Sequence, residues 1–502
     1  MKELLASIDI GAHSARLLIV QYDRQTGLYD ALDDLEIPVP LGADVFKTGK
    51  ISNESVQMLC GILKKFRQKL KEYRIETCRA IATSAVREAA NAEVFIERVK
   101  FLTGIDLQIF TGVDEARLGY LAAHSELPGD FGFEEKRLML ADIGTGACQV
   151  SKFDHGIMQF TETIKLGTLR AAEYLSETSS PAARIEFLGP MIGGAFSELA
   201  YLSRKMECDA LVVTGASPRA LLAMRSAKQS GREAVELKGN EFRKLCRIAE
   251  NMTVDALGGK FNIKSDIAEA VLPCCMMISS LLKLTKAKQI HVLTISTKYS
   301  LIEDYIGSEL NRTDPFEPQI FGIASQTAER YGCDMRLSAS TAIMAEKLFH
   351  ELQPLHGMDH HELILLKVAA LLYKTGLFVS NQAYHKHSHY IILNTELPGL
   401  SLEDRKIVAL AARYHRKSLP KPQHPEYMAV PAEKRAVVNK LAAILRLASG
   451  LVVACKPDER MKVRITPGLV TVKMGGASHP AALDYIDTGL FDYAFASKII
   501  FV

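Results

Sequence analysis

The chain has 502 residues, 48% of them hydrophobic, so it can bury large cores and is too long for a single domain. Its formal net charge of +3 excludes a strongly basic or acidic protein, so any site for a polyanion must be a local concentration of charge. The nine cysteines contain no C-x-x-C pair, which argues against a zinc site and favours reduced, buried thiols in a cytoplasmic protein.

Two stretches near the start of the chain repeat one pattern. Asp9-Ile10-Gly11 ends one apolar run and Asp142-Ile143-Gly144 ends another, and a second strand-like run follows each glycine. The pattern predicts two β-hairpins and differs from the dinucleotide fingerprint, whose glycine turn leads into a helix. Either copy alone is ordinary turn chemistry. Because glycine lets backbone N–H groups approach an anion and an aspartate can hold a cation beside it, the repetition favours a clamp for phosphate.

Hydrophobic periodicity divides the chain into four predicted domains, residues 1–127, 128–308, 309–455 and 456–502. The first two alternate strands and helices, and each begins with one of the two hairpins. Long helical patterns fill the third, and the fourth contains a β-type alternation around Pro467-Gly468. The predicted strands are 4–8, 17–21, 78–82, 107–110, 138–141, 150–153, 211–214, 290–295 and part of 462–473. The predicted helices are 56–73, 93–102, 114–123, 338–352, 362–373, 402–413 and 436–449.

No targeting or membrane segment is expected. Charged residues at Glu3 and Asp9 interrupt the N-terminus, which is unlike a signal peptide. The apolar stretch 437–455 contains Lys440 and Arg446, so we expect a core helix there.

Three further motifs carry a family resemblance. They are A-T-S-A-V-R-E-A at 82–89, G-V-D-E-A-R-L-G-Y-L at 112–121 and R-Y-H-R-K at 413–417. Together with the paired hairpins, they make the chain resemble, over essentially its whole length, the exopolyphosphatase/guanosine pentaphosphate phosphohydrolase (Ppx/GppA) family of the actin-like ATPase superfamily. The resemblance implies two actin-like (ribonuclease H-like) α/β domains, a helical HD-like domain and a small β-containing C-terminal region.

The same resemblance implies a cleft between the α/β halves, where Mg²⁺ and an activated water meet the terminal phosphate of polyphosphate or guanosine pentaphosphate. Glu115 matches the catalytic base, and Arg87 matches a position that helps to hold the phosphate chain. Asp142 and Asp9 match metal-proximal carboxylates. The residues that fall in the two phosphate loops are Gly11, His13, Ser14, Gly144, Thr145 and Gly146. Without the resemblance, Glu115 would be a first-turn helix acid, and Arg87 would pair on the surface with Glu88 or Glu93.

Both loops depart from the family pattern. The first loop usually reads Asp-x-Gly-Ser-Asn-Ser, and this chain has Ala12 and His13 in the middle positions. The second usually reads Asp-x-Gly-Gly-Gly-Ser-x-Glu, and here Thr145, Ala147 and Gln149 replace a glycine, the serine and the glutamate. Gln149 keeps the shape of the glutamate and loses its charge, which weakens a metal or water contact there. His13 is either a compensating phosphate donor or a bystander.

The third domain also lacks the acids of true HD phosphohydrolases. Tyr373-Lys374 stands in place of the metal-binding His-Asp pair, and both aspartates of a later motif are replaced in 447–452. We expect a structural domain whose histidines cap helices or lie on the surface, with a metal cluster as the weaker alternative. The basic run at 413–421 either grips a long polyanion or complements the end of a helix.

Three functions remain open. The first is a Mg²⁺-dependent hydrolase of polyphosphate ends or guanosine pentaphosphate, for which Glu115 and Arg87 argue. The second is a weakened relative that binds these anions as a regulator, for which Thr145, Ala147 and Gln149 argue. The third, an actin-like ATPase or kinase, rests on the hairpins alone. We adopt the first and expect a cytoplasmic homodimer that binds neither membrane nor specific nucleic acid.

Overall fold

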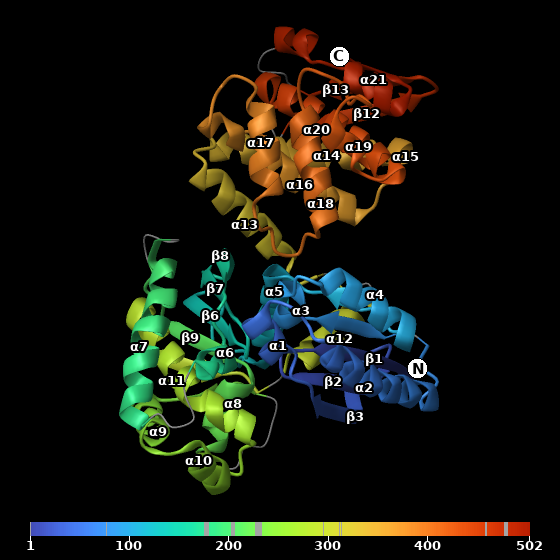
Figure 1. Cartoon of the computed structure of the whole chain (residues 1–502). Coiled ribbons are helices and arrows are strands. Elements are labelled where there is room, and N and C mark those ends of the chain that lie inside the picture. Colours follow the sequence, from blue (N-terminus) through green and yellow to red (C-terminus); the bar gives the residue numbers. More distant parts are fainter. Residues whose placement is uncertain are drawn as a thin grey trace. The chain divides into compact units, whose positions relative to one another are not determined.

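The computed structural model describes residues 2–76, 78–174, 180–201, 206–225, 233–294, 296–310, 312, 314–456, 459–475 and 480–502. These residues divide into two units, Met1–Phe316 and Glu317–Val502, which are described separately. The first unit consists of two α/β halves, each built on one sheet, and the second is mainly helical with a small sheet (Figure 1). The predicted fold class is therefore confirmed. The finer four-domain division stays a prediction.

The first half is built on a five-stranded sheet of order β3-β2-β1-β4-β5. β1, β2 and β3 form an antiparallel meander, whereas β4 and β5 run parallel to β1. Helix α2 has a buried stripe at helical spacing that covers the core of this sheet, as its periodicity predicts. The elements are β1 (Lys2–Ile10), β2 (Ser14–Asp23), β3 (Tyr29–Pro38), α1 (Leu41–Thr48), α2 (Asn53–Glu72), β4 (Arg79–Ala82), α3 (Ser84–Glu88), α4 (Ala92–Thr103), β5 (Gln108–Ile109) and α5 (Gly112–Glu126).

The second half repeats this plan in a six-stranded sheet of order β10-β11-β9-β6-β7-β8. Again three strands form an antiparallel meander, β6 to β8, and β9 and β11 continue the sheet in parallel. The elements are β6 (Arg137–Ile143), β7 (Cys148–Asp154), β8 (Ile157–Ile164), α6 (Thr168–Glu173), α7 (Pro181–Ser197), a 3₁₀ turn η1 (Glu198–Tyr201), β9 (Ala210–Thr214), α8 (Ala216–Ala223), β10 (Val235–Glu236), α9 (Gly239–Asn251), α10 (Val254–Phe261), α11 (Ser265–Thr285), β11 (Gln289–Val292) and α12 (Thr297–Glu309).

The two halves exchange helices. Helix α5 follows the first sheet in sequence but packs on β6, β7 and β8, whereas α12 follows the second sheet and packs on β1 and β2 (Figure 1). Arg117 of α5 joins the two helices, because its guanidinium contacts Asp304 at 2.5 Å and Asp314 at 2.7 Å. The exchange ties the halves together and fixes the start of α5 between the sheets.

Some elements differ from those expected. Strand β3 was not predicted, because it carries Asp30, Asp33, Asp34 and Glu36 and lies at the sheet edge with alternate residues exposed. Helix α11 was also missed, since Pro273 in its middle reads as a helix breaker. Strand β11 ends earlier than the predicted 290–295, and residue 295 lies outside the described residues.

The second unit packs helices around an apolar core and ends in a three-stranded sheet, β12-β13-β14. The β-type alternation expected around Pro467-Gly468 is the hairpin β12-β13, and Gly468 in its turn has a φ of 74°. The elements are α13 (Glu317–Arg330), α14 (Met335–Glu351), α15 (Gln353–His356), α16 (His360–Leu372), η2 (Thr375–Phe378), α17 (Tyr384–Leu393), α18 (Leu402–Tyr414), α19 (Pro425–Met428), α20 (Ala432–Ala454), β12 (Met461–Thr466), β13 (Leu469–Met474), η3 (Pro480–Tyr485), α21 (Gly489–Phe495) and β14 (Lys498–Phe501).

Two helices, α11 and α20, have the length and apolar composition of a membrane span. Each has 56% of its most apolar window buried inside its own unit. Buried residues such as Leu281 and Leu445 belong to the protein cores, which accounts for the apolar composition without a membrane.

Candidate active site

The two predicted hairpins have the same turn. The Gly11 N–H donates to the Ser14 carbonyl at 2.9 Å, and the Gly144 N–H donates to the Ala147 carbonyl at 3.0 Å. Strand pairing places Asp9 opposite Arg16 in the first hairpin and Asp142 opposite Gln149 in the second. The internal repeat read from the sequence is therefore a structural repeat.

Both turns face one narrow cavity of about 100 Å³ between the halves. Nine of the ten predicted site residues line it: Asp9, Gly11, His13, Ser14, Glu115, Asp142, Gly144, Thr145 and Gly146. The structure thus brings the paired glycine turns, both aspartates and the acid at position 115 together.

Close backbone approach explains two glycines at this site. A Cβ at Gly146 would lie 2.6 Å from the ring of Phe46 and 2.7 Å from the hydroxyl of Ser84, so the second turn touches the first half. A Cβ at Gly112 would lie 1.9 Å from the hydroxyl of Thr163, so the start of α5 sits directly on β8. A larger residue at either position would require these neighbouring side chains to shift.

Glu115 lies in the first turn of α5, which the Thr111–Asp114 capping box starts. The Asp114 carboxylate accepts hydrogen bonds from the Thr111 N–H at 2.8 Å and from its hydroxyl at 2.7 Å. The Glu115 side chain is only 13% exposed. Burial raises its pKa to about 7, Arg87 opposes that rise, and the negative charges of Asp142 and Asp9 add to it. A carboxyl group that titrates near neutrality can take up a proton from water.

The two aspartates differ in their partners. Asp9 is 3% exposed and pairs with Arg16, whose Nη1 lies 3.1 Å from its carboxylate. Burial raises the pKa of Asp142 to about 6, Arg219 opposes the rise, and Asp9 adds to it. The mutual repulsion of three acids around one cavity is the arrangement that a divalent cation would relieve.

Arg87 contacts the acid at position 115. Its Nη1 donates to Glu115 at 3.1 Å and to the Phe110 carbonyl at 2.5 Å, while its Nη2 is buried and has no hydrogen-bond partner among the described residues. The surface pairing with Glu88 or Glu93 considered from the sequence is therefore wrong. The phosphate-holding role stays a prediction, and Arg87 is the one predicted site residue that does not line the cavity.

Two predicted phosphate ligands have protein partners. The Ser14 hydroxyl donates to Glu36 at 2.9 Å, and the His13 ring lies 3.4 Å from the Asp266 carboxylate across the cleft. The phosphate contacts available from the first turn are therefore mainly those of its backbone.

Gln149 is held inside the second half. Its amide nitrogen donates to the Thr161 hydroxyl at 2.6 Å, and its amide oxygen accepts from the Thr163 hydroxyl at 2.5 Å. The residue is 4% exposed and lies at the base of the cavity. It connects β7 to the strand on which the start of α5 rests, so an amide here supports the position of Glu115.

The acids at this cavity do not form a ready-made metal cage. No group of three histidine, cysteine or acidic side chains among the described residues is close enough to hold a metal ion. Mg²⁺ usually takes one or two carboxylates and completes its shell with waters and substrate phosphates, so Asp9 and Asp142 suit it.

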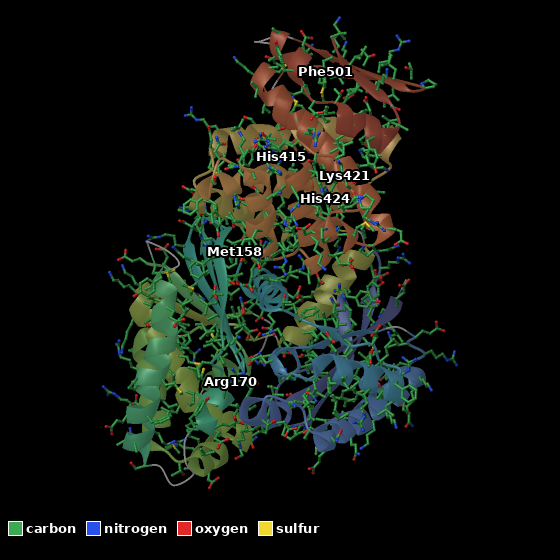
Figure 2. The ribbon with its side chains drawn as sticks, turned by 45° about the horizontal axis from the view of Figure 1, so that its top comes forward. Met158, Arg170, His415, Lys421, His424 and Phe501 are labelled. Carbon is green, nitrogen blue, oxygen red and sulfur yellow. The ribbon has the colours of Figure 1, made fainter. Side chains whose placement is uncertain are left out.

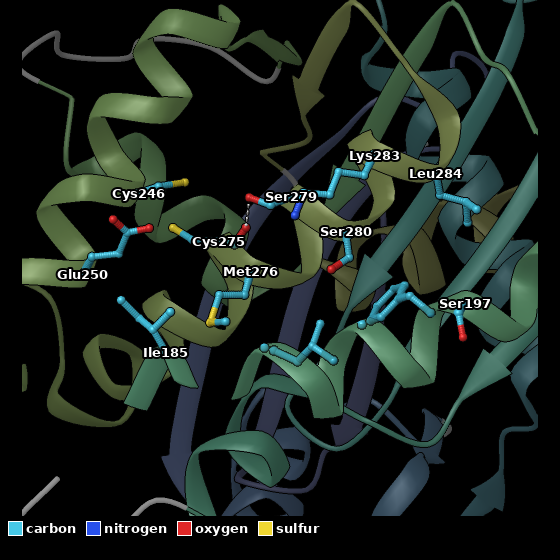
Figure 3. A pocket seen from close by; sticks show the side chains of 14 residues that line it. Ile185, Ser197, Cys246, Glu250, Cys275, Met276, Ser279, Ser280, Lys283 and Leu284 are labelled. Atoms are coloured by element: carbon cyan, nitrogen blue, oxygen red, sulfur yellow. Dashed lines mark hydrogen bonds between the residues drawn. The ribbon is translucent and has the colours of Figure 1, made fainter. Parts of the chain in front are cut away.

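A larger cavity of about 590 Å³ lies in the second half, between α7, α9 and α11 (Figure 3). Its lining is mainly apolar, and its polar groups include Glu250, Lys283 and the thiols of Cys246 and Cys275. The cysteines are all free thiols. No described charge cluster comparable to that of the smaller cavity converges here, so we do not place the chemistry in it.

Four histidines of the second unit, at positions 356, 385, 389 and 415, are buried, so the expected surface position is wrong for them, whereas His360 and His361 are exposed. His415 is 3% exposed, and its ring contacts the Ala412 carbonyl at 2.6 Å and the Tyr384 hydroxyl at 3.0 Å. Burial lowers its pKa to about 3, so the ring is neutral. Figure 2 labels it inside the helical unit. His356 similarly contacts the Phe349 carbonyl at 2.7 Å.

Sequence reasoning missed Arg16, Arg219 and Ser84, which also line the cavity. Arg16 could have been found, because a turn from Gly11 to Ser14 places it opposite Asp9 in a hairpin. Arg219 and Ser84 come from elsewhere in the chain, and only the fold brings them to the site.

Comparisons with known proteins give one consistent result. The model of the Ppx/GppA phosphatase family matches residues 19–305, and that of Ppx/GppA phosphatase, domain III, matches residues 323–464. A guanosine-5'-triphosphate,3'-diphosphate pyrophosphatase of Vibrio atlanticus is 20% identical over 455 residues, which are 89% of this chain and 86% of the relative. The crystal structure of a Ppx/GppA family member from Aquifex aeolicus covers 62% of this chain and 99% of its own, with 21% identity and a TM-score of 0.52. The crystal structure of an exopolyphosphatase from Cytophaga hutchinsonii covers 61% of this chain and 98% of its own, with 21% identity and a TM-score of 0.54.

Proposed function

The chain belongs to the Ppx/GppA phosphatase family, and we propose that it hydrolyses a terminal phosphoanhydride bond of inorganic polyphosphate or guanosine pentaphosphate. The relative from Vibrio atlanticus supports this assignment over most of both chains. The observation that carries the proposal is the position of Glu115, a nearly buried acid with a pKa of about 7 in a cavity between two glycine turns.

The proposed reaction uses few side chains. Glu115 accepts a proton from a water whose oxygen attacks the terminal phosphorus, and the bond from that phosphorus to the bridging oxygen breaks. The products are orthophosphate and a chain shortened by one phosphate. Backbone N–H groups of the turns offset the charge that develops on the phosphoryl oxygens, and Arg87 holds Glu115 in position.

We also propose that Asp9 and Asp142 hold a Mg²⁺ ion at this cavity. A bound Mg²⁺ would neutralise phosphate charge and orient the terminal phosphoryl group. We propose a cytoplasmic location, which the free thiols of the cysteines fit. We also propose that the chain forms a homodimer.

A phosphate-release assay tests the function directly. With Mg²⁺, the purified protein is expected to release orthophosphate from polyphosphate or guanosine pentaphosphate, and ATP serves as the control substrate of the actin-like alternative. Release from either phosphate substrate supports the proposal. No release from any of the three contradicts it, and release from ATP alone favours the ATPase.

A second function, anion binding without turnover, is favoured by one residue. Gln149 stands where the family usually has a glutamate, and both ends of its amide are engaged. If the chain is a binding protein, calorimetry will show guanosine pentaphosphate bound without hydrolysis, and Gln149→Glu will gain activity. If it is a hydrolase, we expect Gln149→Glu to lower kcat about tenfold, because the variant loses the amide donor that holds Thr161 and adds a fourth acid to the cavity. Gln57→Glu, on the exposed face of α2, is the matched control.

A further inference from the structure

One side chain crosses between the two halves beside the phosphate turns. Arg170, on the short helix α6 of the second half, donates through Nη2 to the Glu88 carboxylate of α3 in the first half at 2.8 Å. Figure 2 labels Arg170 where the green half meets the blue half of the first unit. The two side chains are 12% and 23% exposed, so solvent screens their attraction only in part.

The same guanidinium stacks on an aromatic ring of the first half. Its central carbon lies 3.8 Å from the centre of the Phe46 ring, within the range of a cation–π contact. Phe46 in turn lies against the second turn, since a Cβ at Gly146 would come within 2.6 Å of the ring. Arg170 therefore contacts the first half through an ion pair with Glu88 and a stacking contact with Phe46.

Arg170 is also tied to the second phosphate turn itself. Its backbone N–H donates to the Thr145 carbonyl at 3.1 Å, and its Nη1 donates to the Lys165 carbonyl at 2.9 Å. On the other side, Glu88 follows Arg87, the residue that contacts Glu115. The bridge therefore connects the second turn to the helix that supports the proposed base.

We infer that Arg170, Glu88 and Phe46 form a clamp that sets the distance between the two phosphate turns. Arg170 and Glu88 are thus positioning residues, which act through the turns and touch no reacting atom. The kinetic part of this inference rests on the proposed function, whereas the closure of the cleft does not.

Hydrogen exchange measured by mass spectrometry tests the closure without substrate. Glu88→Gln and Arg170→Gln are each expected to raise exchange about tenfold in residues 9–16 and 142–149, and the double variant should do no more than either single one. Arg170→Lys keeps the charge and loses the planar stack on Phe46. Its exchange in the two turns should therefore lie between that of the wild type and that of Arg170→Gln. Glu93→Gln, an exposed acid on α4, is the matched control. Unchanged exchange in the turns, a uniform rise across the chain, or fully additive effects would each overturn the clamp.

Steady-state kinetics with polyphosphate tests the role in the reaction. Both glutamine variants are expected to lower kcat about tenfold while KM changes less than threefold, because an open cleft binds the chain but misaligns the turns. A loss confined to the melting temperature, with kcat unchanged, would overturn the positioning role. If the wild type shows no turnover while exchange in the turns still rises, the proposed hydrolase fails and the clamp stands.

Discussion

Glu115→Gln is expected to lower kcat for phosphate release by about a thousandfold, within the range that a general base supplies. Glutamine keeps the length and shape of the side chain, can still accept from Arg87, and cannot take a proton from water at neutral pH. The measurement is orthophosphate release at saturating substrate and Mg²⁺. Glu97→Gln, an exposed acid on α4, should keep full activity.

The pH profile of the wild type supplies the second half of this test. Because the pKa of Glu115 is about 7 and its ionised form is the base, activity should rise about tenfold per pH unit below 7 and level off above it. The variant should lose this rise. A variant with wild-type activity, or a wild-type rate that falls with pH through 7, contradicts the assignment.

The melting temperature distinguishes a loss of catalysis in Glu115→Gln from a loss of folding. The pKa of Glu115 is higher in the folded protein than the ordinary value of 4.5, so its contribution to stability is present at low pH and is lost as pH rises through about 7. At pH 8, where the wild type holds a buried charge, the neutral glutamine should leave the melting temperature equal or higher. A large fall in the melting temperature would assign the lost activity to structure.

The sequence was sufficient to predict the parts of the site that local chemistry specifies. The Asp-x-Gly repeat predicts the two hairpins, because an apolar run, a turn residue and a second apolar run lie next to one another in the chain. The predicted helix 114–123 similarly places Glu115 in a first helical turn, and α5 begins two residues earlier, at Gly112. Both features appear in the structure.

The remaining features of the fold and the site depend on contacts between residues far apart in the chain, which the sequence pattern does not reveal. The exchange of α5 and α12 between the sheets depends on packing between residues about 190 apart, such as Arg117 and Asp304. The Arg170–Glu88 contact also joins residues far apart in the chain, and a helix of six residues gives no periodic signal for its polar face. Gln149 looked like a simple loss of charge, whereas its amide supports the neighbouring strand.

Asp142→Asn should raise the Mg²⁺ concentration needed for half-maximal activity by about a hundredfold. Asparagine keeps a carbonyl oxygen but removes the negative charge, and Mg²⁺ in such a site depends on one or two carboxylates. Calorimetric titration with Mg²⁺ alone gives a readout that does not depend on turnover, and Asp255→Asn, exposed on α10, is the matched control.

Protons should compete with the metal at the same carboxylate. The pKa of Asp142 is about 6, so the Mg²⁺ affinity of the wild type should fall as the pH drops below 6, when the protonated acid no longer offers a charge. Since the asparagine side chain cannot titrate, the variant should lose most of this pH dependence while binding weakly at every pH. If Asp142→Asn binds Mg²⁺ as tightly as the wild type, the metal is held elsewhere, and the repulsion between Asp9 and Asp142 must be relieved by Arg16 and Arg219 alone.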